Sequence, residues 1–417
     1  MNPIPFDIVI GLDRSDKTAD LHLIHLRDDR SEHQRIGTTP EALQEWVGQL
    51  QTNFAGQRIA ICLEQPAHNL IVFLQGFEFI TLYPINPITL QKFREAFVTS
   101  RAKSDTQDAF YLARLLATHH ATLKPWAPDD AATRRLQRLV TDRRAVVDHR
   151  TLLSNRLKSL LKDYFPQALQ LAGDDLWRPL ACAFLLKWPT LLQLQKARPE
   201  TIRRFYYLHG SRSQSLIQRR LDLIARAVPL TQDGHLLESF SLRIELVVGE
   251  LQLVTQTIAK YDRLIAQAFA EHSDAQIFAS FPGAGPTLGP RLLAAVGSQR
   301  ERYVSAQRLQ CFSGIAPVLK QSGHSHYVHR RYRCSKFLRQ SFHEYAGESI
   351  RHSTWARAFY SQQKSRGHKH HTIVRALAYK WIRIIFRCWQ NFECYDENRY
   401  LRALEKNGSQ LLRITTQ

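Results

Sequence analysis

Two aspartates, Asp105 and Asp108, stand three residues apart in the stretch SRAKSDTQDAFYLARLL (residues 100–116), whose apolar residues recur at helical spacing. At that spacing on a helix, the two carboxylates lie on one face. Such a pair can hold a divalent cation when other ligands converge there. The same residues also suit an ordinary helix start, because Ser104 and Gln107 form a capping-box pattern and acidic residues favour the first turn.

Two further carboxylates end predicted strands elsewhere in the first third of the chain. Asp13 closes FDIVIGLD and Glu64 closes RIAICLE, and both stretches are rich in apolar residues. Taken singly, Asp13 is an ordinary turn residue and Glu64 an ordinary surface charge. Together with the helix pair they fit a cage for two Mg²⁺ ions about 3.5–4 Å apart, which clamps the attacking and leaving oxygens of a phosphoryl displacement. We therefore expect Asp13, Glu64, Asp105 and Asp108 to be metal ligands and catalytic residues.

The elements that must position these carboxylates predict an α/β domain with a mixed sheet. The helix over residues 40–51 begins with Thr39 as N-cap and Pro40 in the first turn. A second short helix is predicted in AHNLIVFLQGF. Strands are predicted at residues 6–13, 20–26, 33–37, 58–64 and 80–86.

After KPWAPDD (124–130) the pattern changes to long helices. Apolar residues at helical spacing, with many arginines between them, predict one helix of about 35 residues from Ala131 to Phe165. A second long helix is predicted from about Leu236 to Ala270. Such helices are typical of a coiled coil that joins subunits, or of a bundle that packs within one chain, and the pattern leaves both open.

The last third is predicted to be mainly helical, with a clear helix at residues 371–390 and a polar, peripheral tail after about Asp396. FPGAGPTLGPRLLAAVG resembles a helix–hairpin–helix, in which the backbone amides near Gly283 and Gly285 would bind a phosphate. Pro-Gly turns between helices are also common without any ligand. The predicted domains are residues 1–128, 129–272 and 273–395, followed by the tail 396–417.

Composition indicates a polyanionic partner. The 417 residues carry 57 Lys and Arg against 37 Asp and Glu, a net charge of +20, which suits nucleic acid. A membrane surface is the competing partner, but no apolar run reaches the roughly 18 residues of a spanning helix. No signal peptide is recognisable. The six scattered cysteines form no CxxC pair, as expected of reduced thiols in a cytoplasmic protein.

A basic segment, HSHYVHRRYRCSKFLR, interleaves cations with Tyr327 and Tyr332. That mixture suits phosphate contacts and base stacking, although a solvated loop would look similar. The nearby RGHKHH (366–371) favours a phosphate over zinc, because it lacks matching cysteines or acidic partners. The candidate nucleic-acid contacts of the segment are Arg330, Arg331, Arg333, Lys336 and Arg339.

Four stretches, IGLD, CLE, YPINP and RAKSDTQDA, resemble the RuvC-like, ribonuclease H-fold domain of DEDD transposases of the insertion-sequence one-ten family. In that family a helical linker follows, and then a C-terminal domain with a PGxG motif and a catalytic serine. The resemblance spans about residues 6–390. It assigns the metal tetrad to Asp13, Glu64, Asp105 and Asp108.

The same resemblance assigns the catalytic serine to Ser322 in APVLKQSGHS, which follows a Gly-x-x-Pro segment at Gly314 and Pro317. Two departures concern local backbone shape. The family often has a Thr-Gly pair after the glutamate, whereas this chain continues with EQPAHN. Beyond the serine, the common Lys-x-Gly element is represented only by Lys336 and Arg339 in SKFLRQ.

The resemblance implies a transposase that cuts and rejoins double-stranded donor and target DNA through Mg²⁺-dependent phosphoryl transfer to a serine. It also implies guidance by a structured non-coding bridge RNA of the element and a homo-oligomer, dimer to tetramer. Three alternatives remain: a site-specific DNA invertase of the pilin-inverting type, a RuvC-like Holliday-junction nuclease that needs no serine, and a non-catalytic nucleic-acid-binding protein.

Overall fold

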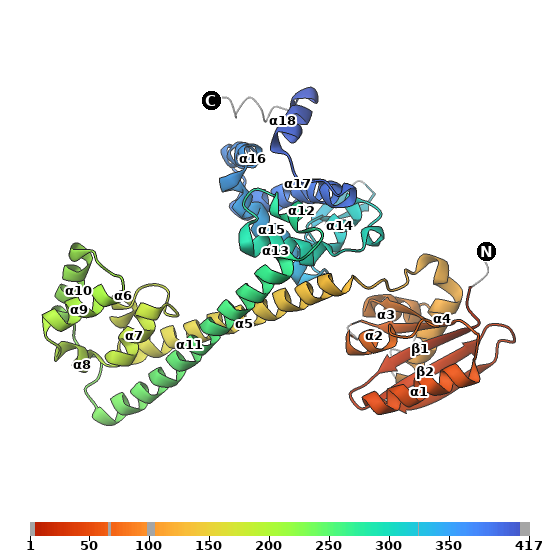
Figure 1. The fold of residues 1–417 in the computed structure, drawn as a ribbon, viewed down its shortest axis with the longest axis horizontal. Helices are drawn as coiled ribbons and strands as arrows, with labels where there is room; N and C mark the ends of the chain where they lie inside the picture. The colour runs from red at the N-terminus through yellow and green to blue at the C-terminus, as the bar shows by residue number, and fades with distance from the viewer. Residues whose placement is uncertain (1–4, 66–67, 98–104, 324, 409–417) are drawn as a thin grey trace. The chain divides into compact units, whose positions relative to one another are not determined.

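The computed structural model describes residues 5–65, 68–97, 105–323 and 325–408 (Figure 1). The chain divides into two compact units, Met1–Pro128 and Asp129–Gln417, which are described separately. The predicted capping residue Ser104 lies outside the described residues.

The first unit is built on a mixed five-stranded sheet of order β3-β2-β1-β4-β5, which is ribonuclease H-like. Strands β1, β2 and β3 form an antiparallel meander, whereas β4 and β5 join the other edge of β1 in parallel. The predicted mixed sheet is thereby confirmed. The strands are β1 Ile8–Arg14, β2 Thr18–His25, β3 Ser31–Gly37, β4 Ile59–Glu64 and β5 Ile80–Ile85.

Helices cover both faces of this sheet. Apolar residues of α1 (Pro40–Asn53) and α2 (His68–Leu74) share one core with Ile8, Ile10 and Leu12 of β1. Thr39 caps α1 by accepting a hydrogen bond from the Ala42 amide, as its sequence position predicts.

The opposite face of the sheet carries a second core, formed with α3 (Pro87–Glu95) and α4 (Asp105–His119). Helix α3 was absent from the sequence prediction. It begins directly after β5, because the Asn86 side chain accepts a hydrogen bond from the Ile88 amide and Pro87 suits the first turn. A 3₁₀ turn, His120–Thr122, follows α4.

Helix α4 packs with its backbone directly on β1 at Gly11. A Cβ at this position would lie 1.9 Å from the carbonyl oxygen of Ala109 and 2.4 Å from the amide nitrogen of Ala113. No side chain fits there, so α4 reaches this position only because residue 11 is glycine. The contact fixes the distance between the helix and the strand that ends in Asp13.

The second unit is organised by two long antiparallel helices, α5 (Ala131–Tyr164, 34 residues) and α11 (Gly234–Ala270, 37 residues). They run side by side (Figure 1), with Arg143 paired to Asp262 and Arg135 to Glu271. Both helices match the predicted ranges. Between them the chain forms α6 (Ala168–Leu171), α7 (Pro179–Lys187), α8 (Leu191–Gln195), α9 (Pro199–Leu208) and α10 (Gln214–Arg226).

The remaining chain is mainly helical around a core that includes Trp355, Trp381 and Trp389. The predicted helix at residues 371–390 is present as α17. A two-stranded hairpin interrupts the helices where no strand was predicted, with β6 directly before the basic segment and β7 within it. The elements are α12 (Ala275–Ala279), α13 (Gly285–Val296), η2 (Arg300–Arg302), α14 (Ala306–Phe312), β6 (Val318–Ser322), β7 (Ser325–His329), α15 (Lys336–His352), α16 (Thr354–Ser365), α17 (His370–Asn391) and α18 (Glu397–Lys406).

The polar tail is not structureless. Helix α18 places the Tyr400 ring 4.9 Å from that of Trp355, and Glu397 accepts a hydrogen bond from the Thr354 amide at 2.7 Å. Across the described ranges, no helix is both long and apolar enough to span a bilayer.

Replacing Gly11 with Ala should displace α4 from β1, because the new methyl group would overlap helix backbone that cannot move alone. We expect a local loss of about 1–3 kcal/mol, the usual cost of overpacking. Hydrogen-exchange mass spectrometry should show faster exchange in α4 and unchanged exchange in α5. Gly48→Ala is the matched control, because an added Cβ there has nothing within 4 Å; equal protection of α4 in both variants would contradict the account.

Candidate functional site

Two of the predicted carboxylates end neighbouring parallel strands. The register of β1 and β4 pairs Leu12 with Leu63, so Asp13 and Glu64 follow at the same edge of the sheet. Side chains alternate along a strand. Because Leu12 and Leu63 face the core under α1 and α2, Asp13 and Glu64 face the side that carries α4.

Helix α4 supplies the other pair. Asp108 is 3% exposed, and its Oδ1 accepts a hydrogen bond of 2.6 Å from Nη1 of Arg94 on α3. Asp105 is exposed at the first position of α4. Arg94 was not predicted as part of the site, because the sequence does not indicate which carboxylate this arginine meets. A guanidinium therefore already balances the buried member of the predicted tetrad.

Asp20 is a further acidic residue that the sequence pattern did not reveal. It lies opposite Asp13 in the β1–β2 ladder and is 2% exposed. Its Oδ1 accepts hydrogen bonds from Arg35 Nη2 at 3.0 Å and Thr106 Oγ1 at 3.4 Å. His33 Nε2 also lies 3.0 Å from this oxygen. Asp20 thus ties the first turn of α4 to the sheet beside the tetrad.

The tetrad residues fit Mg²⁺ by type, because hard carboxylate oxygens are its preferred protein ligands. Their positions also fit, because Asp13 and Glu64 lie at one edge of the sheet and on the face against which α4 packs. Within the described ranges, no three His, Cys, Asp or Glu side chains are gathered closely enough to hold an ion as they stand. Burial, followed by the negative charge of Glu64, raises the pKa of Cys62 on β4 to about 12, so this thiol stays protonated.

Ser322 belongs to the second unit and is exposed at the end of β6. It pairs with Ser325 across the tip of the hairpin, where Gly323 has a φ of +55°. The segment before the hairpin is fixed at Gly314, whose φ is +73° and where a Cβ would lie 2.1 Å from Cys334 Sγ. The Ser322 hydroxyl is therefore exposed to solvent at the end of β6, and the close packing of Gly314 against Cys334 fixes the chain before the hairpin.

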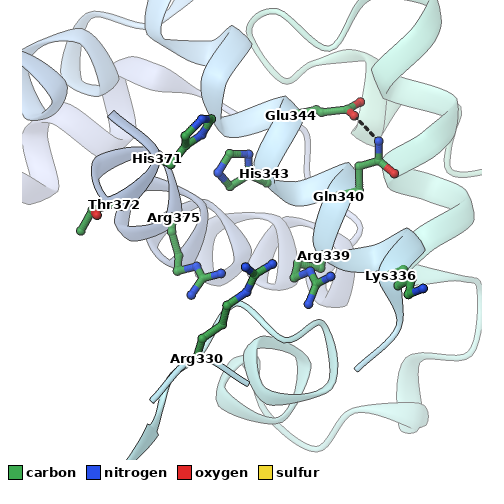
Figure 2. Close-up of a pocket in the computed structure, with 9 residues that line it drawn as sticks. All are labelled: Arg330, Lys336, Arg339, Gln340, His343, Glu344, His371, Thr372 and Arg375. Carbon is green, nitrogen blue, oxygen red and sulfur yellow. Dashed lines mark hydrogen bonds between the residues drawn. The ribbon is translucent and has the colours of Figure 1, made fainter. Parts of the chain in front are cut away.

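The predicted basic contacts divide into two groups. A pocket of about 730 Å³ brings together Arg330, Lys336 and Arg339 (Figure 2). Arg331 and Arg333 are not among the described residues that line it. The pocket also recruits residues from α15 and α17 that sequence analysis did not connect with the segment, namely Gln340, His343, Glu344, His371, Thr372 and Arg375.

The two glycines of the predicted helix–hairpin–helix lie at the turn between α12 and α13. Gly283 has a φ of +78°, and a Cβ there would come within 2.8 Å of the His352 ring. Gly285 has a φ of +52° and open space around it. The turn therefore exists, although α12 has only five residues.

Family models of known proteins match two separate parts of the chain. A DEDD-type family model of IS110 elements, described as "Transposase", matches residues 10–166. A second, described as "Transposase IS116/IS110/IS902 family", matches residues 275–361. The chain belongs to the IS110 family of transposases. The first match covers nearly all of the sheet, α4 and the four carboxylates of the predicted tetrad, and the second covers Ser322 and most of the residues that line the pocket.

Relatives of this transposase are similar along most of their length. The IS117 mini-circle protein of Streptomyces coelicolor, named as a transposase, is 28% identical over 82% of this chain and 83% of its own. An uncharacterized 42 kDa protein of insertion element IS900 from Mycobacterium paratuberculosis is 25% identical over 90% of this chain and 94% of its own. An uncharacterized 43.6 kDa protein of insertion element IS110 from S. coelicolor is 25% identical over 71% of this chain and 72% of its own. The transposase is thus a DNA-processing enzyme.

Replacing Arg94 with Gln should destabilise the first unit by about 1–3 kcal/mol, because the buried Asp108 carboxylate loses a charged hydrogen-bond donor. Mg²⁺ should raise the melting temperature of this variant more than that of the wild type, since the cation no longer competes with a guanidinium. Thermal unfolding with and without Mg²⁺ measures both effects. Lys92→Gln on the exposed side of α3 is the control, and a smaller Mg²⁺ shift in Arg94→Gln than in this control would refute the competition.

Proposed function

We propose that this transposase cuts and rejoins double-stranded DNA by Mg²⁺-dependent phosphoryl transfer to Ser322. The observation that carries the proposal is the placement of Asp13 and Glu64 at one edge and one face of a ribonuclease H-like sheet, with α4 held against that face at Gly11. A nuclease needs only the carboxylates. An exposed serine in the second family-matched region adds the acceptor that rejoining requires.

In this proposal Asp13, Glu64, Asp105 and Asp108 hold Mg²⁺, two ions by analogy with other phosphoryl-transfer sites. Bound there, the metal supplies charge stabilisation for the displacement at phosphorus. Arg94 holds the Asp108 carboxylate in place through Oδ1 and would compete with a cation for this oxygen. Asp20 keeps the start of α4 in position through Thr106.

Ser322 acts as the nucleophile. Its Oγ forms a bond to the phosphorus of a DNA phosphodiester, and the bond from that phosphorus to one strand oxygen breaks. The hydroxyl proton leaves to solvent, which reaches this exposed side chain, and the departing strand oxygen takes up a proton. The phosphoserine linkage conserves the phosphodiester bond energy, so a second strand end can later displace the serine and be joined.

The proposal includes a structured guide RNA and assembly into a dimer or tetramer in the cytoplasm. The net charge of +20 supports an RNA partner in addition to DNA. Oligomerisation is supported by a stripe of leucines on α11, where Leu242, Leu246 and Leu253 are 63%, 58% and 64% exposed. Spacings of four and seven residues are typical of a coiled-coil seam. Under this proposal residues 129–272 form the oligomerisation region and 273–395 the serine-bearing domain.

Replacing Asp105 with Ala should abolish DNA cleavage in Mg²⁺ while leaving nucleic-acid affinity nearly unchanged, because a ligand is lost from an exposed helix start and not from a packed core. Cleavage assays on labelled donor DNA, with filter binding in parallel, measure both. Asp16→Ala is the control, since it removes an exposed carboxylate elsewhere in the same unit. Near-normal recombination by Asp105→Ala would exclude Asp105 from the metal site.

Replacing Ser322 with Ala should remove the covalent protein–DNA adduct and the recombinant product, since no hydroxyl remains to accept the phosphoryl group. Assembly with DNA should persist, because one oxygen contributes little to a polyanion interface. Denaturing gels with end-labelled DNA compare the two proteins, and Ser325→Ala across the hairpin is the matched control. Recombination by Ser322→Ala, or only free hydrolysed ends from the wild type, would show that the enzyme acts as a simple nuclease.

A further inference from the structure

The pocket at the base of the Ser322 hairpin contains more positive charge than the protein neutralises. Figure 2 shows the guanidinium groups of Arg330, Arg339 and Arg375 directed toward one another. They come from three separate places, the end of β7, helix α15 and helix α17. Convergence of cations from distant segments costs electrostatic energy in the free protein.

The carboxylate in the pocket lining is already engaged. Among the described lining residues, Glu344 is the single acid. It accepts a hydrogen bond from Gln340 Nε2 at 2.6 Å and pairs with the buried Arg291. Glu344 is therefore already bonded to side chains of α13 and α15, and it does not neutralise the charge of the three arginines.

The electrostatics of the neighbouring groups agree with this imbalance. Burial, followed by repulsion from Arg330 and Arg339, lowers the pKa of Arg375. Burial, His371 and Arg375 lower the pKa of His343. The first turn of α17, which contributes His371 and Thr372, has no side-chain cap and adds the positive end of a 22-residue helix.

We propose that this pocket binds a phosphodiester group of a nucleic-acid strand and anchors that strand beside the Ser322 hairpin. The inference rests on the proposed function and names a site for its substrate. Arginine forks suit phosphate oxygens, and the volume of about 730 Å³ admits a nucleotide and not only an isolated ion. Strand β7 leads from the hairpin tip to Arg330, on the order of 15 Å, so the anchored phosphate lies several nucleotides from the attacked one.

The test uses the full-length protein with a short duplex DNA of arbitrary sequence and, separately, an RNA hairpin, both fluorescently labelled. Fluorescence anisotropy over a NaCl series should show that Arg375→Gln raises the Kd roughly tenfold, the effect of losing one charged hydrogen bond. The slope of log K against log salt should fall by up to about 0.9. Arg375→Lys should recover part of the affinity. Arg387→Gln, an exposed arginine later on α17, should behave as wild type.

Stability provides a readout that separates binding from packing. Removing one of three repelling cations should leave the melting temperature of Arg375→Gln unchanged or raised, whereas a structural arginine would lower it. Arg330→Gln, an exposed substitution that cannot unfold the core, should weaken binding in the same way. A loss for duplex DNA alone or for RNA alone identifies the strand that the pocket holds, and either result upholds the site.

The outcomes separate the two proposals. If the wild type shows no salt-dependent affinity for either probe, the proposed function fails. If the wild type binds but Arg375→Gln and Arg330→Gln both match Arg387→Gln, the pocket is not a phosphate site, and the proposed function is unaffected. A lowered melting temperature in Arg375→Gln with unchanged binding by Arg330→Gln also overturns the pocket assignment.

Discussion

The contact between the backbone of α4 and Gly11 of β1 is the constraint on which the first unit depends. A strand and a helix normally meet through side chains, which keep them well apart. Here the absence of a side chain lets the carbonyl of Ala109 approach the strand directly. The same approach brings the helix that carries Asp105 and Asp108 to the face toward which Asp13 and Glu64 point. The position of α4 beside the candidate metal site is therefore set by a residue that has no side chain.

Charged side chains occur in two different arrangements within the chain. Where charges are buried for structural reasons, they are paired: Asp20 with Arg35, Asp274 with Arg300, and Asp129 with Arg302. Each of these carboxylates is at most 5% exposed in its side chain. The pocket that contains Arg375 differs, since the exposed Arg330 and the partly exposed Arg339 and Arg375 face one another and Glu344 pairs elsewhere. The contrast supports our proposal that the unbalanced charge of this pocket binds a phosphate.

Much of the fold could be predicted from local patterns. Apolar residues that alternate in β1 and β2 and run continuously in β4 indicated these strands, the stretches HQRIG and ITLYPIN indicated β3 and β5, and helical spacing located α1, α5, α11 and α17 within a few residues. Helix α3 was not predicted, because it is short and begins directly after β5. The hairpin β6–β7 was missed because its exposed strands carry few apolar residues to mark a period.

The candidate site was only half visible in the sequence. Carboxylates at strand ends can be found by reading along the chain, since parallel strands end at the same edge. Partners from distant segments cannot be found in this way, because the packing of the folded chain decides which side chains meet. Arg94 meets Asp108, and Thr106 meets Asp20, only after folding. The same holds for Arg375 and Arg330 in the pocket. Local sequence therefore indicated the carboxylates that we propose as metal ligands, but neither the residues that contact them nor the pocket.

The exposed hairpin that carries Ser322 has a consequence for how variants of this protein are judged. Two short strands without a covering layer contribute little to global stability, and Leu319 and Val328 are 76% and 68% exposed. The serine that we propose as nucleophile thus lies on a part of the chain that contributes little to the stability of the rest of the molecule. A damaged hairpin would leave solubility, melting behaviour and spectroscopic signatures intact. Screens that rank variants by folding alone will count such proteins as sound.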